Sequence, residues 1–218
     1  MTKQVLILGA TGKIAGHAIA TLLAKTTDQL LLFTRHPQNL SIADESRETV
    51  IKGDTLKTDE LNAAVAQADV VYANLRNPAI AQQARNIVAA MDQAGIKQLV
   101  WISSIGIYDE VPGKFGDWNN EMLGGGQEDS YLGTYRKAAD EISASDLDYT
   151  IIRPAWLTDK DVVDYETTKR GEKFKGTEVS RKSIGNLVAE VIANPAKYAR
   201  QDLGVNKPNS DGDKPAWY

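Results

Sequence analysis

Glycines near the start of the chain are spaced as in a turn that holds a phosphate group. Gly9, Gly12 and Gly16 follow an apolar run, Gln4–Leu8, and precede residues with helical periodicity. Glycine allows a tight turn and lets the backbone approach a pyrophosphate without a Cβ in the way. The free N–H groups of the following helix would face that anion. The spacing is G-x-x-G-x-x-A rather than G-x-G-x-x-G, and a plain strand-to-helix turn without a ligand is the alternative.

A basic residue stands where a dinucleotide would place its adenosine ribose. Arg35 follows the second apolar run and precedes His36, with no acidic residue adjacent. An Asp or Glu in this region binds the 2′-hydroxyl of NAD, whereas a basic residue accommodates the 2′-phosphate of NADP. A guanidinium can also grip phosphate through two hydrogen bonds. The sequence therefore favours NADP(H), with an ordinary surface arginine as the alternative.

A sheet and helices must position these residues. Apolar residues recur at helical spacing, as at Ile14, Ala18 and Leu22. Between such segments, short apolar runs predict strands buried on both faces: Gln4–Leu8, Leu30–Thr34, Thr49–Lys52, Val70–Ala73, Leu99–Ile102 and Thr150–Arg153. The alternation predicts an α/β fold, a Rossmann-like doubly wound parallel sheet in three layers, α/β/α. Right-handed crossovers would put the glycine turn at the carboxyl edge of the sheet.

Two stretches interrupt this rhythm. Residues 105–130 have weak periodicity and include the run Gly124-Gly125-Gly126, and residues 157–180 are mostly polar. Both follow predicted strands at the carboxyl edge, so we expect them to form loops around a substrate. Residues 206–218 are expected to be a surface extension.

Composition limits the classes of function. The 218 residues predict one domain over residues 1–218, and the net charge of −4 argues against a nucleic-acid-binding surface. No apolar run is long enough to span a membrane, and no signal pattern opens the chain, so the expected location is the cytoplasm. The absence of cysteine excludes disulfides and thiolate chemistry. His17 and His36 have no Asp or Glu at metal-site spacing, so no metal is expected.

Taken together, the motifs resemble a known family. The chain is similar to the atypical short-chain dehydrogenases/reductases in its Gly9-Ala10-Thr11-Gly12-Lys13-Ile14-Ala15, Thr34-Arg35, Gly53-Asp54, Ser103-Ser104 and Ile152-Arg153-Pro154. Within that group it resembles most the NmrA-like and biliverdin-reductase-B-like NAD(P)-binding proteins, which often carry the label NAD-dependent epimerase/dehydratase. The resemblance covers roughly residues 3–205.

The resemblance implies which residues contact the cofactor. The glycine turn would bind the phosphates, and the ends of the later strands would line the rest of the cofactor as far as the nicotinamide. The residues concerned are Gly9, Thr11, Gly12, Lys13, Ile14, Arg35, Asp54, Asn74, Leu75, Ser103 and Pro154. Asp54 would accept a hydrogen bond from the adenine amino group; alternatively it caps the following helix, because Asp is a good cap residue.

The resemblance also implies catalytic residues, with one departure. Ser104 matches the Ser that hydrogen-bonds a reacting carbonyl, although paired serines are also common turn formers. Lys137 matches the Lys of the Tyr-x-x-x-Lys pair, but Gly133 stands where the Tyr should be. Tyr131 and Tyr135 lie two positions away on either side, on other helix faces than Gly133. Proton donation by the usual Tyr is therefore not expected.

Aromatic residues supply candidate walls for a planar substrate. Trp156 follows the sixth predicted strand, where its indole would form a stacking wall or, alternatively, pack in the core. Tyr108, Trp118 and Tyr165 lie in the two irregular stretches and would complete an aromatic cleft.

These features lead to two main hypotheses. The first is an NADPH-dependent reductase that passes hydride to a flavin, a quinone or a similar planar acceptor. The second is an NADP(H) sensor like NmrA, which would regulate a protein partner without doing chemistry. A sugar-nucleotide epimerase or dehydratase is a third and weaker option, because such enzymes rely on the absent Tyr.

Overall fold

The structure is a computed structural model that describes residues 2–76 and 78–218. In these residues the strands are β1 Gln4–Leu8, β2 Gln29–Thr34, β3 Glu48–Lys52, β4 Val70–Ala73, β5 Gln98–Ile102, β6 Asp148–Pro154, β7 Trp156–Thr158, β8 Glu166–Lys169, β9 Glu178–Ser180 and β10 Gln201–Asn206. The helices are α1 Lys13–Lys25, α2 Thr58–Val65, α3 Ile80–Ala94, α4 Gly113–Leu123, α5 Tyr131–Ala144, α6 Arg181–Ala193 and α7 Pro195–Tyr198, with a short 3₁₀ turn at Pro37–Asn39.

Most of the strands form one sheet in the order β3-β2-β1-β4-β5-β6-β10-β8. Its neighbouring strands run parallel except β10 and β8, which are antiparallel. Leu8 at the end of β1 pairs with Phe33 of β2 on one side and with Ala73 of β4 on the other. The expected doubly wound sheet is confirmed. Its switch point lies between β1 and β4, where such sheets bind ligands at their carboxyl edge.

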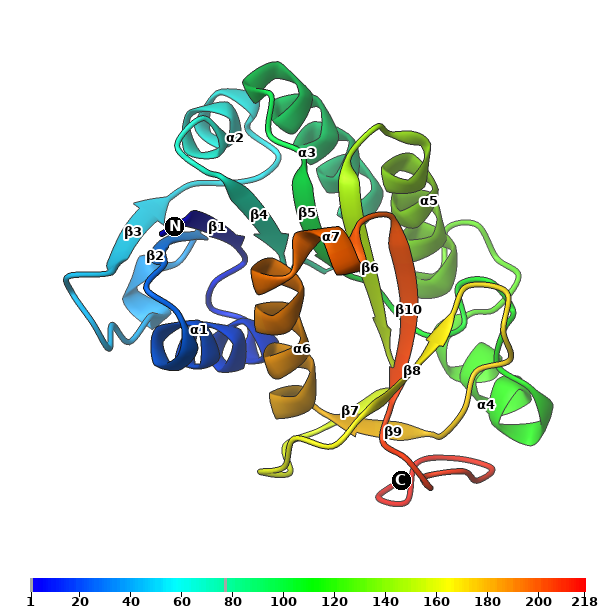
Figure 1. The fold of residues 1–218 in the computed structure, drawn as a ribbon. Coiled ribbons are helices and arrows are strands. Elements are labelled where there is room, and N and C mark those ends of the chain that lie inside the picture. Colours follow the sequence, from blue (N-terminus) through cyan, green and yellow to red (C-terminus); the bar gives the residue numbers. More distant parts are fainter. Residues whose placement is uncertain (1, 77) are drawn as a thin grey trace.

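Helices cover both faces of the sheet (Figure 1). α1 and α6 pack together on one face, and α2, α3 and α5 pack on the other. The strands alternate between the two cores: Val5 and Ile7 belong to the core under α1 and α6, and Leu6 and Leu8 to the core under the other three helices. Burial on both faces explains why these strands are continuous apolar runs. The three-layer arrangement is therefore confirmed.

The two irregular stretches contain more regular structure than their sequences indicate. α4 lies within residues 105–130, and β7 pairs with β9 in a small parallel sheet of its own. The helix escapes notice because its buried positions are Phe115, Gly116 and Asn119, which make no apolar stripe. The segments β8 and β9 are short and polar, and they pair with strands distant in the sequence, so local periodicity does not mark them.

The last residues of the chain fold back instead of forming a surface extension. The N–H of Thr177 donates to the carbonyl of Ser210 at 2.9 Å. Farther along, the ring of Tyr218 lies edge-on to Trp118 with centroids 4.8 Å apart. In Figure 1 the C-terminus lies beside β9, which agrees with these contacts. The tail is therefore part of the wall around the carboxyl edge of the sheet.

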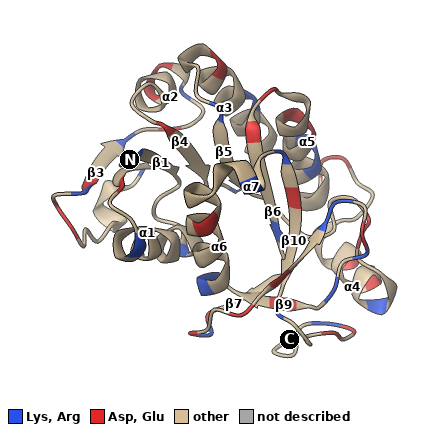
Figure 2. Cartoon of the chain, in the orientation of Figure 1, with Lys and Arg blue, Asp and Glu red and all other residues tan. Residues whose placement is uncertain are grey.

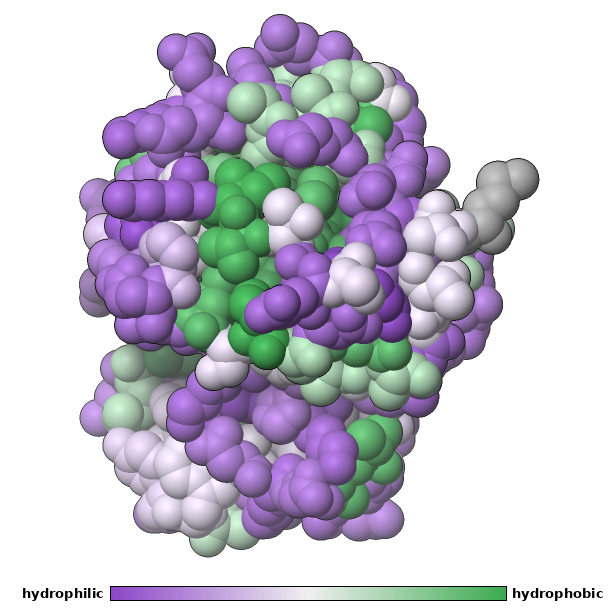
Figure 3. Space-filling view, turned by 90° about the vertical axis from the view of Figure 1, so that its left-hand side faces the viewer, coloured by the Kyte–Doolittle hydropathy of each residue, from purple (hydrophilic) through white to green (hydrophobic). Residues whose placement is uncertain are grey.

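The surface carries mixed charge, and one of its sides has a hydrophobic patch. Lys and Arg are interspersed with Asp and Glu over the elements (Figure 2). Figure 3 shows the side bordered by the edge strand β3, where hydrophobic side chains gather between polar ones. Within residues 2–76 and 78–218, no helix is long and apolar enough to cross a membrane, and no three acidic or His side chains are grouped to hold a metal ion.

Candidate functional site

A cleft with a volume of about 880 Å³ runs along the carboxyl edge of the sheet. This volume falls within the ~300–1,000 Å³ typical of small-molecule sites. The ends of β1, β2, β4, β5 and β6 contribute residues to its walls. All the residues predicted to contact a cofactor line it: Gly9, Thr11, Gly12, Lys13, Ile14, Arg35, Asp54, Asn74, Leu75, Ser103 and Pro154.

The glycine turn is pressed against the end of β4. Gly9 has a φ of +79°, in the left-handed region that favours glycine, and a Cβ there would lie 2.3 Å from the carbonyl oxygen of Asn74. A Cβ on Gly12 would lie 2.0 Å from Nδ2 of Asn74. α1 begins at Lys13 with Gly12 as its N-cap and no side-chain cap, so its first N–H groups stay available to an anion. The turn therefore fits a dinucleotide phosphate.

Basic side chains outnumber acidic ones around the cleft. Arg35 lies in the wall directly after β2, beside the Gly53 and Asp54 turn that follows β3. Among the described residues that line the cleft, the basic ones are Lys13, Arg35, His36, Arg76 and Arg181, and the one carboxylate is that of Asp54. A positive wall of this kind favours an anionic ligand. Sequence reasoning missed Arg181, because it comes from the start of α6, far along the chain.

Asp54 is a turn residue in the cleft wall and does not cap a helix. Its Oδ1 accepts a hydrogen bond from the N–H of Leu56 at 3.0 Å, and the N-cap of α2 is Lys57. The alternative that Asp54 caps the following helix is therefore wrong. The carboxylate keeps acceptor capacity for a ligand, since an ionised carboxylate can accept several hydrogen bonds.

A polar pair next to Asp54 was not predicted. Gln83 of α3 donates through Nε2 to the hydroxyl of Thr55 at 3.0 Å, and both residues line the cleft. The Oε1 atom of Gln83 is buried and has no partner among the described residues. An unpartnered buried acceptor in a cleft wall marks a position for a ligand donor. The signal in the sequence was a polar residue on the otherwise apolar face of α3.

The two serines at the end of β5 both line the cleft. The hydroxyl of Ser104 donates to the carbonyl of Ile105 at 3.2 Å, whereas Oγ of Ser103 is buried with no partner among the described residues. The Ser104 hydroxyl must rotate away from this local bond to reach a ligand. Its predicted contact with a reacting group is compatible with the position and stays a prediction.

α5 presents two tyrosines to the cleft and directs its lysine elsewhere. Tyr131 and Tyr135 are one helical turn apart and line the cleft with ring centroids 4.4 Å apart. Lys137, predicted as catalytic, is not among the lining residues, and its Nζ lies 3.2 Å from Asp129 and 3.4 Å from Glu128. The reason is geometric: Lys137 is two positions from Tyr135, on the opposite side of the helix. The predicted role of Lys137 in the cleft is therefore not supported by its position.

The position of the missing Tyr is filled by backbone. A Cβ on Gly133 would lie 2.1 Å from the carbonyl oxygen of Gln127 and 2.4 Å from that of Glu128. A tyrosine there would force the preceding turn to move. The absence of the Tyr-x-x-x-Lys pair is thus built into the start of α5, where Ser130 caps the helix by accepting from the N–H of Gly133.

One end of the cleft has aromatic walls. Trp156 and Trp217 both line it, with ring centroids 6.3 Å apart. Trp118, predicted as a substrate contact, does not line the cleft but packs behind Trp156 at 4.6 Å between centroids. Asn119 fixes this wall by accepting a hydrogen bond from Nε1 of Trp156 at 2.9 Å. Trp217 was missed because it follows a polar segment with no helical or strand periodicity.

Two predicted substrate residues lie outside the cleft. The hydroxyl of Tyr165 donates to Glu190 at 2.9 Å beside a separate hollow of about 320 Å³. The hydroxyl of Tyr108 donates to Asp202 at 2.7 Å. Burial raises the pKa of Tyr108, and Asp202 raises it further, so the phenol stays neutral and keeps donating. Neither tyrosine is among the residues that line the cleft, so their positions do not support the prediction that they complete its aromatic wall.

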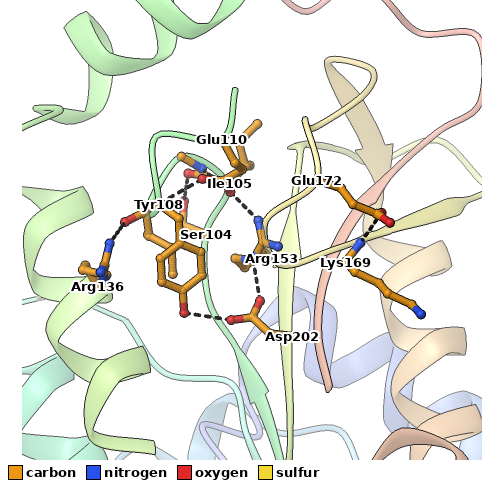
Figure 4. A network of polar contacts seen from close by, with 11 residues as sticks. Ser104, Ile105, Tyr108, Glu110, Arg136, Arg153, Lys169, Glu172 and Asp202 are labelled. Carbon is orange, nitrogen blue, oxygen red and sulfur yellow. Dashed lines mark hydrogen bonds and ion pairs between the residues drawn. The ribbon is translucent and has the colours of Figure 1, made fainter. Parts of the chain in front are cut away.

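Tyr108 belongs to an ion network near Ser104 and Ile105, the residues that follow β5 (Figure 4). Arg153 of β6 is 1% exposed, lies 2.5 Å from Asp202 of β10 and pairs with Glu110. Glu110 also accepts hydrogen bonds from the N–H groups of Gly106 and Tyr108 at 3.0 and 2.9 Å. The network ties the segment after Ser104 to two strands of the sheet.

Solved structures share this fold over nearly the whole chain. A Rossmann-fold NAD(P)-binding family protein from Shigella flexneri is 41% identical, with a TM-score of 0.84 over 99% of this chain and 98% of that one. A short-chain dehydrogenase/reductase from Veillonella parvula, crystallised with NADP, is 29% identical, with a TM-score of 0.90 over 99% and 100%. ChuY, an anaerobillin reductase from Escherichia coli O157:H7, is 18% identical, with a TM-score of 0.78 over 96% and 99%, a likeness of fold.

A family model agrees with the site. No protein of curated function matches the chain. The model described as NAD(P)H-binding matches residues 9–195, which begin at the first glycine of the turn after β1 and include the cleft-lining ends of β2, β4, β5 and β6. With the glycine turn, the free helix N-terminus and the basic wall in place, the match leads to one conclusion: this chain belongs to the NAD(P)H-binding family of Rossmann-fold proteins.

Proposed function

We propose that the protein is an NADPH-dependent reductase of a planar acceptor such as a flavin, a quinone or a linear tetrapyrrole. The observation that carries this proposal is the aromatic end of the cleft, formed by Trp156 and Trp217 next to Pro154. In this family the end of the sixth strand lies beside the nicotinamide, so a flat acceptor held there would lie against the reactive ring. Indole faces stack well on flat conjugated rings.

The chain's residues have distinct tasks in such a reaction. The glycine turn and the start of α1 hold the phosphates, and the end of β6 places the nicotinamide face toward the aromatic walls. A bound NADPH supplies the hydride. Flavins and quinones take their proton from water, so the reaction does not depend on a Tyr-x-x-x-Lys pair, which the start of α5 excludes sterically.

Two neighbours support the two parts of the proposal. The Veillonella parvula protein was crystallised with NADP, which agrees with a dinucleotide in the same cleft. ChuY is an anaerobillin reductase, which gives an example of a planar acceptor on this fold.

A competing proposal is a sensor that binds NADP(H) and contacts a protein partner. The position of Lys137 outside the cleft favours it, since the usual catalytic lysine is absent from the site.

Consumption of NADPH in the presence of an acceptor panel tests the function. Absorbance at the NADPH band is followed with flavins, quinones and a linear tetrapyrrole, and simple ketones serve as the negative set. We expect reduction of at least one planar acceptor and poor reduction of ketones. If NADPH binds but no planar acceptor is reduced, the sensor proposal replaces this one.

Cofactor preference is a separate part of the proposal. Arg35 lies in the wall where the adenosine 2′-phosphate would sit, so we propose that NADPH binds more tightly than NADH. Arg35→Ala should remove much of this preference, because a hydrogen bond to a charged group contributes ~1.5–3 kcal/mol. Calorimetric titration of both cofactors measures it; equal affinities in the unaltered protein would exclude the preference.

A further inference from the structure

One carboxylate at the rim of the cleft holds two cations that line it. Oδ2 of Asp159 lies 3.0 Å from Nζ of Lys13, and Oδ1 lies 2.7 Å from Nη1 of Arg181. The three residues come from the start of α1, the segment after β7 and the start of α6. Segments far apart in the sequence thus meet at one carboxyl group beside the glycine turn.

The two cations and the carboxylate occupy different places relative to the cleft. Lys13 and Arg181 line it, and Asp159 is not among the lining residues. Lys13 directly follows Gly12, at the start of α1, which has no side-chain cap. Arg181 approaches Leu157 of β7, with its Nη1 3.5 Å from that carbonyl oxygen. The pair therefore joins the glycine turn to the segment around β7 through one carboxylate.

We propose that Lys13 and Arg181 form a clamp for the diphosphate of the dinucleotide, and that Asp159 occupies this clamp when no dinucleotide is bound. On binding, the phosphate oxygens would replace the Asp159 carboxylate as the partner of both cations. The inference rests on the cofactor part of the proposed function and is independent of the acceptor. It assigns a ligand role to Arg181 and a competing role to Asp159.

The exchange needs little reorganisation. The side chains of Lys13 and Asp159 are 70% and 60% exposed, and exposed ion pairs contribute little to stability. A guanidinium binds phosphate through paired, charge-assisted hydrogen bonds, which are stronger. The released carboxylate can turn to water. The segment that carries Asp159 stays anchored by other contacts, among them Lys160 with Glu178 at 2.7 Å.

The neighbouring pair provides a matched control. Asp161 and Lys182 lie on the same two segments as Asp159 and Arg181, and Oδ1 of Asp161 is 2.5 Å from Nζ of Lys182. Neither of these residues lines the cleft. Substituting them removes the same kind of ion pair between the same segments without touching the clamp.

The test is calorimetric titration of NADPH without any acceptor, on variants that fold as judged by circular dichroism. Arg181→Gln should weaken binding by about 10-fold, the effect of one charge-assisted contact, and Arg181→Lys should restore part of it. Asp159→Asn should tighten binding severalfold, because the competing charge is gone. In the double variant Asp159→Asn/Arg181→Gln, the gain in NADPH affinity from Asp159→Asn should be smaller, because one of the two cations is gone. Asp161→Asn and Lys182→Gln should leave the affinity unchanged.

A second ligand distinguishes binding of the diphosphate from a general effect of positive charge in the cleft. Adenosine 2′-monophosphate has the 2′-phosphate but neither phosphate of the diphosphate, so its affinity should respond to Arg35→Ala and not to Arg181→Gln. Equal losses for both ligands in Arg181→Gln would show a general field effect and overturn the clamp. The clamp would also be overturned if Asp159→Asn and Arg181→Gln bound NADPH with the same affinity as the control variants Asp161→Asn and Lys182→Gln. A change in the acceptor KM alone in Arg181→Gln would overturn it as well. Absence of acceptor reduction would overturn the reductase and leave the clamp standing.

Discussion

The two halves of the cleft are built from different kinds of segment. In the cofactor half, which comprises the ends of β1, β2 and β4, each wall is a strand followed directly by its own turn. In the acceptor half, which comprises Trp156, Trp217 and their supports, the wall is assembled from β7, α4 and the end of the chain. The first half is local in sequence; the second depends on contacts between distant residues.

The residues of the two halves are constrained in different ways. The glycines of the cofactor half are held by the approach of the turn to Asn74 and by the space that phosphates need. The acceptor half has no such backbone constraint at Trp156 or Trp217, and its shape is held by ring contacts and by Asn119. We therefore expect substitutions in the first half to abolish binding and those in the second to tune it.

The largest effect is expected for Gly12→Val. A branched side chain at this position would meet Asn74, since a Cβ alone would lie 2.0 Å from its Nδ2, and it would fill space beside the phosphates. We expect NADPH binding to be lost while the far-ultraviolet circular dichroism stays close to that of the unaltered protein. Gly16→Ala is the control, because a Cβ on Gly16 meets nothing within 4 Å. Undiminished binding by folded Gly12→Val would mean that the turn does not approach the cofactor.

Arg153→Met should cause the second largest change, in stability rather than in cofactor affinity. It leaves the carboxylates of Glu110 and Asp202, each 5% exposed, buried without their cation. Breaking a buried pair in this way costs ~3–5 kcal/mol of the free energy of unfolding. Urea denaturation measures the loss. Arg85→Gln, which breaks an exposed pair with Glu141, is the control and should cost ~0–1 kcal/mol.

If Arg153→Met proves as stable as Arg85→Gln, the network does not hold the segment after Ser104, and the acceptor half depends on its ring contacts and on Asn119. A variant that folds with lower stability but keeps its NADPH affinity would sharpen the comparison. It would show that the two halves of the cleft can be destabilised independently.

The sequence reveals the cofactor half because its signals are local. The run Gln4–Leu8, the turn after it and the helix beginning at Lys13 are continuous, so periodicity and glycine spacing are sufficient to predict them. The acceptor half lacks such signals. Trp217 reaches the cleft only because the tail folds back. In the cofactor half the same holds for Arg181, which reaches the cleft because α6 packs on α1. Side chains placed by tertiary packing leave no periodic pattern to read.

The side of α5 that faces the cleft could not be predicted from its sequence either. Matching Lys137 to a family lysine assumed which side of α5 faces the cleft. The tight approach of Gly133 to the turn before it shows that this side is covered by backbone, and Tyr131 and Tyr135 face the cleft instead. The orientation of a helix about its axis depends on its neighbours, here α3 and the sheet, and not on its own spacing alone.

Trp217→Ala should have an intermediate effect, confined to the acceptor. The indole is 51% exposed and forms one wall of the aromatic end. Its loss should raise the acceptor KM by about 10-fold, since an aromatic contact contributes ~0.5–1.5 kcal/mol beyond its buried area. The dissociation constant of NADPH should not change. Trp217→Phe should restore most of the affinity, and an unchanged KM in Trp217→Ala would remove the tail from the acceptor half.

The smallest effect is expected for Tyr135→Phe. Its ring is 3% exposed and packs on Tyr131, and its hydroxyl lies 3.4 Å from the carbonyl oxygen of Leu75. Lys137 pairs with Asp129 and Glu128 and is not among the residues that line the cleft. A planar acceptor that takes its proton from water does not need the phenol, so most of the activity should remain.

Steady-state rates with a flavin or quinone, measured beside the NADPH dissociation constant, decide the role of Tyr135. Loss of a general acid would lower kcat by ~10²–10⁴-fold. A loss of that size in Tyr135→Phe with unchanged cofactor affinity would show that Tyr135 is the proton donor. The acceptor half would then contribute a catalytic residue as well as binding contacts. Tyr131→Phe is the matched control, because it lies one helical turn away on the same cleft-facing side. Retained activity in both variants would limit the tyrosines to packing, and the chemistry would then depend on how the cofactor half presents its hydride.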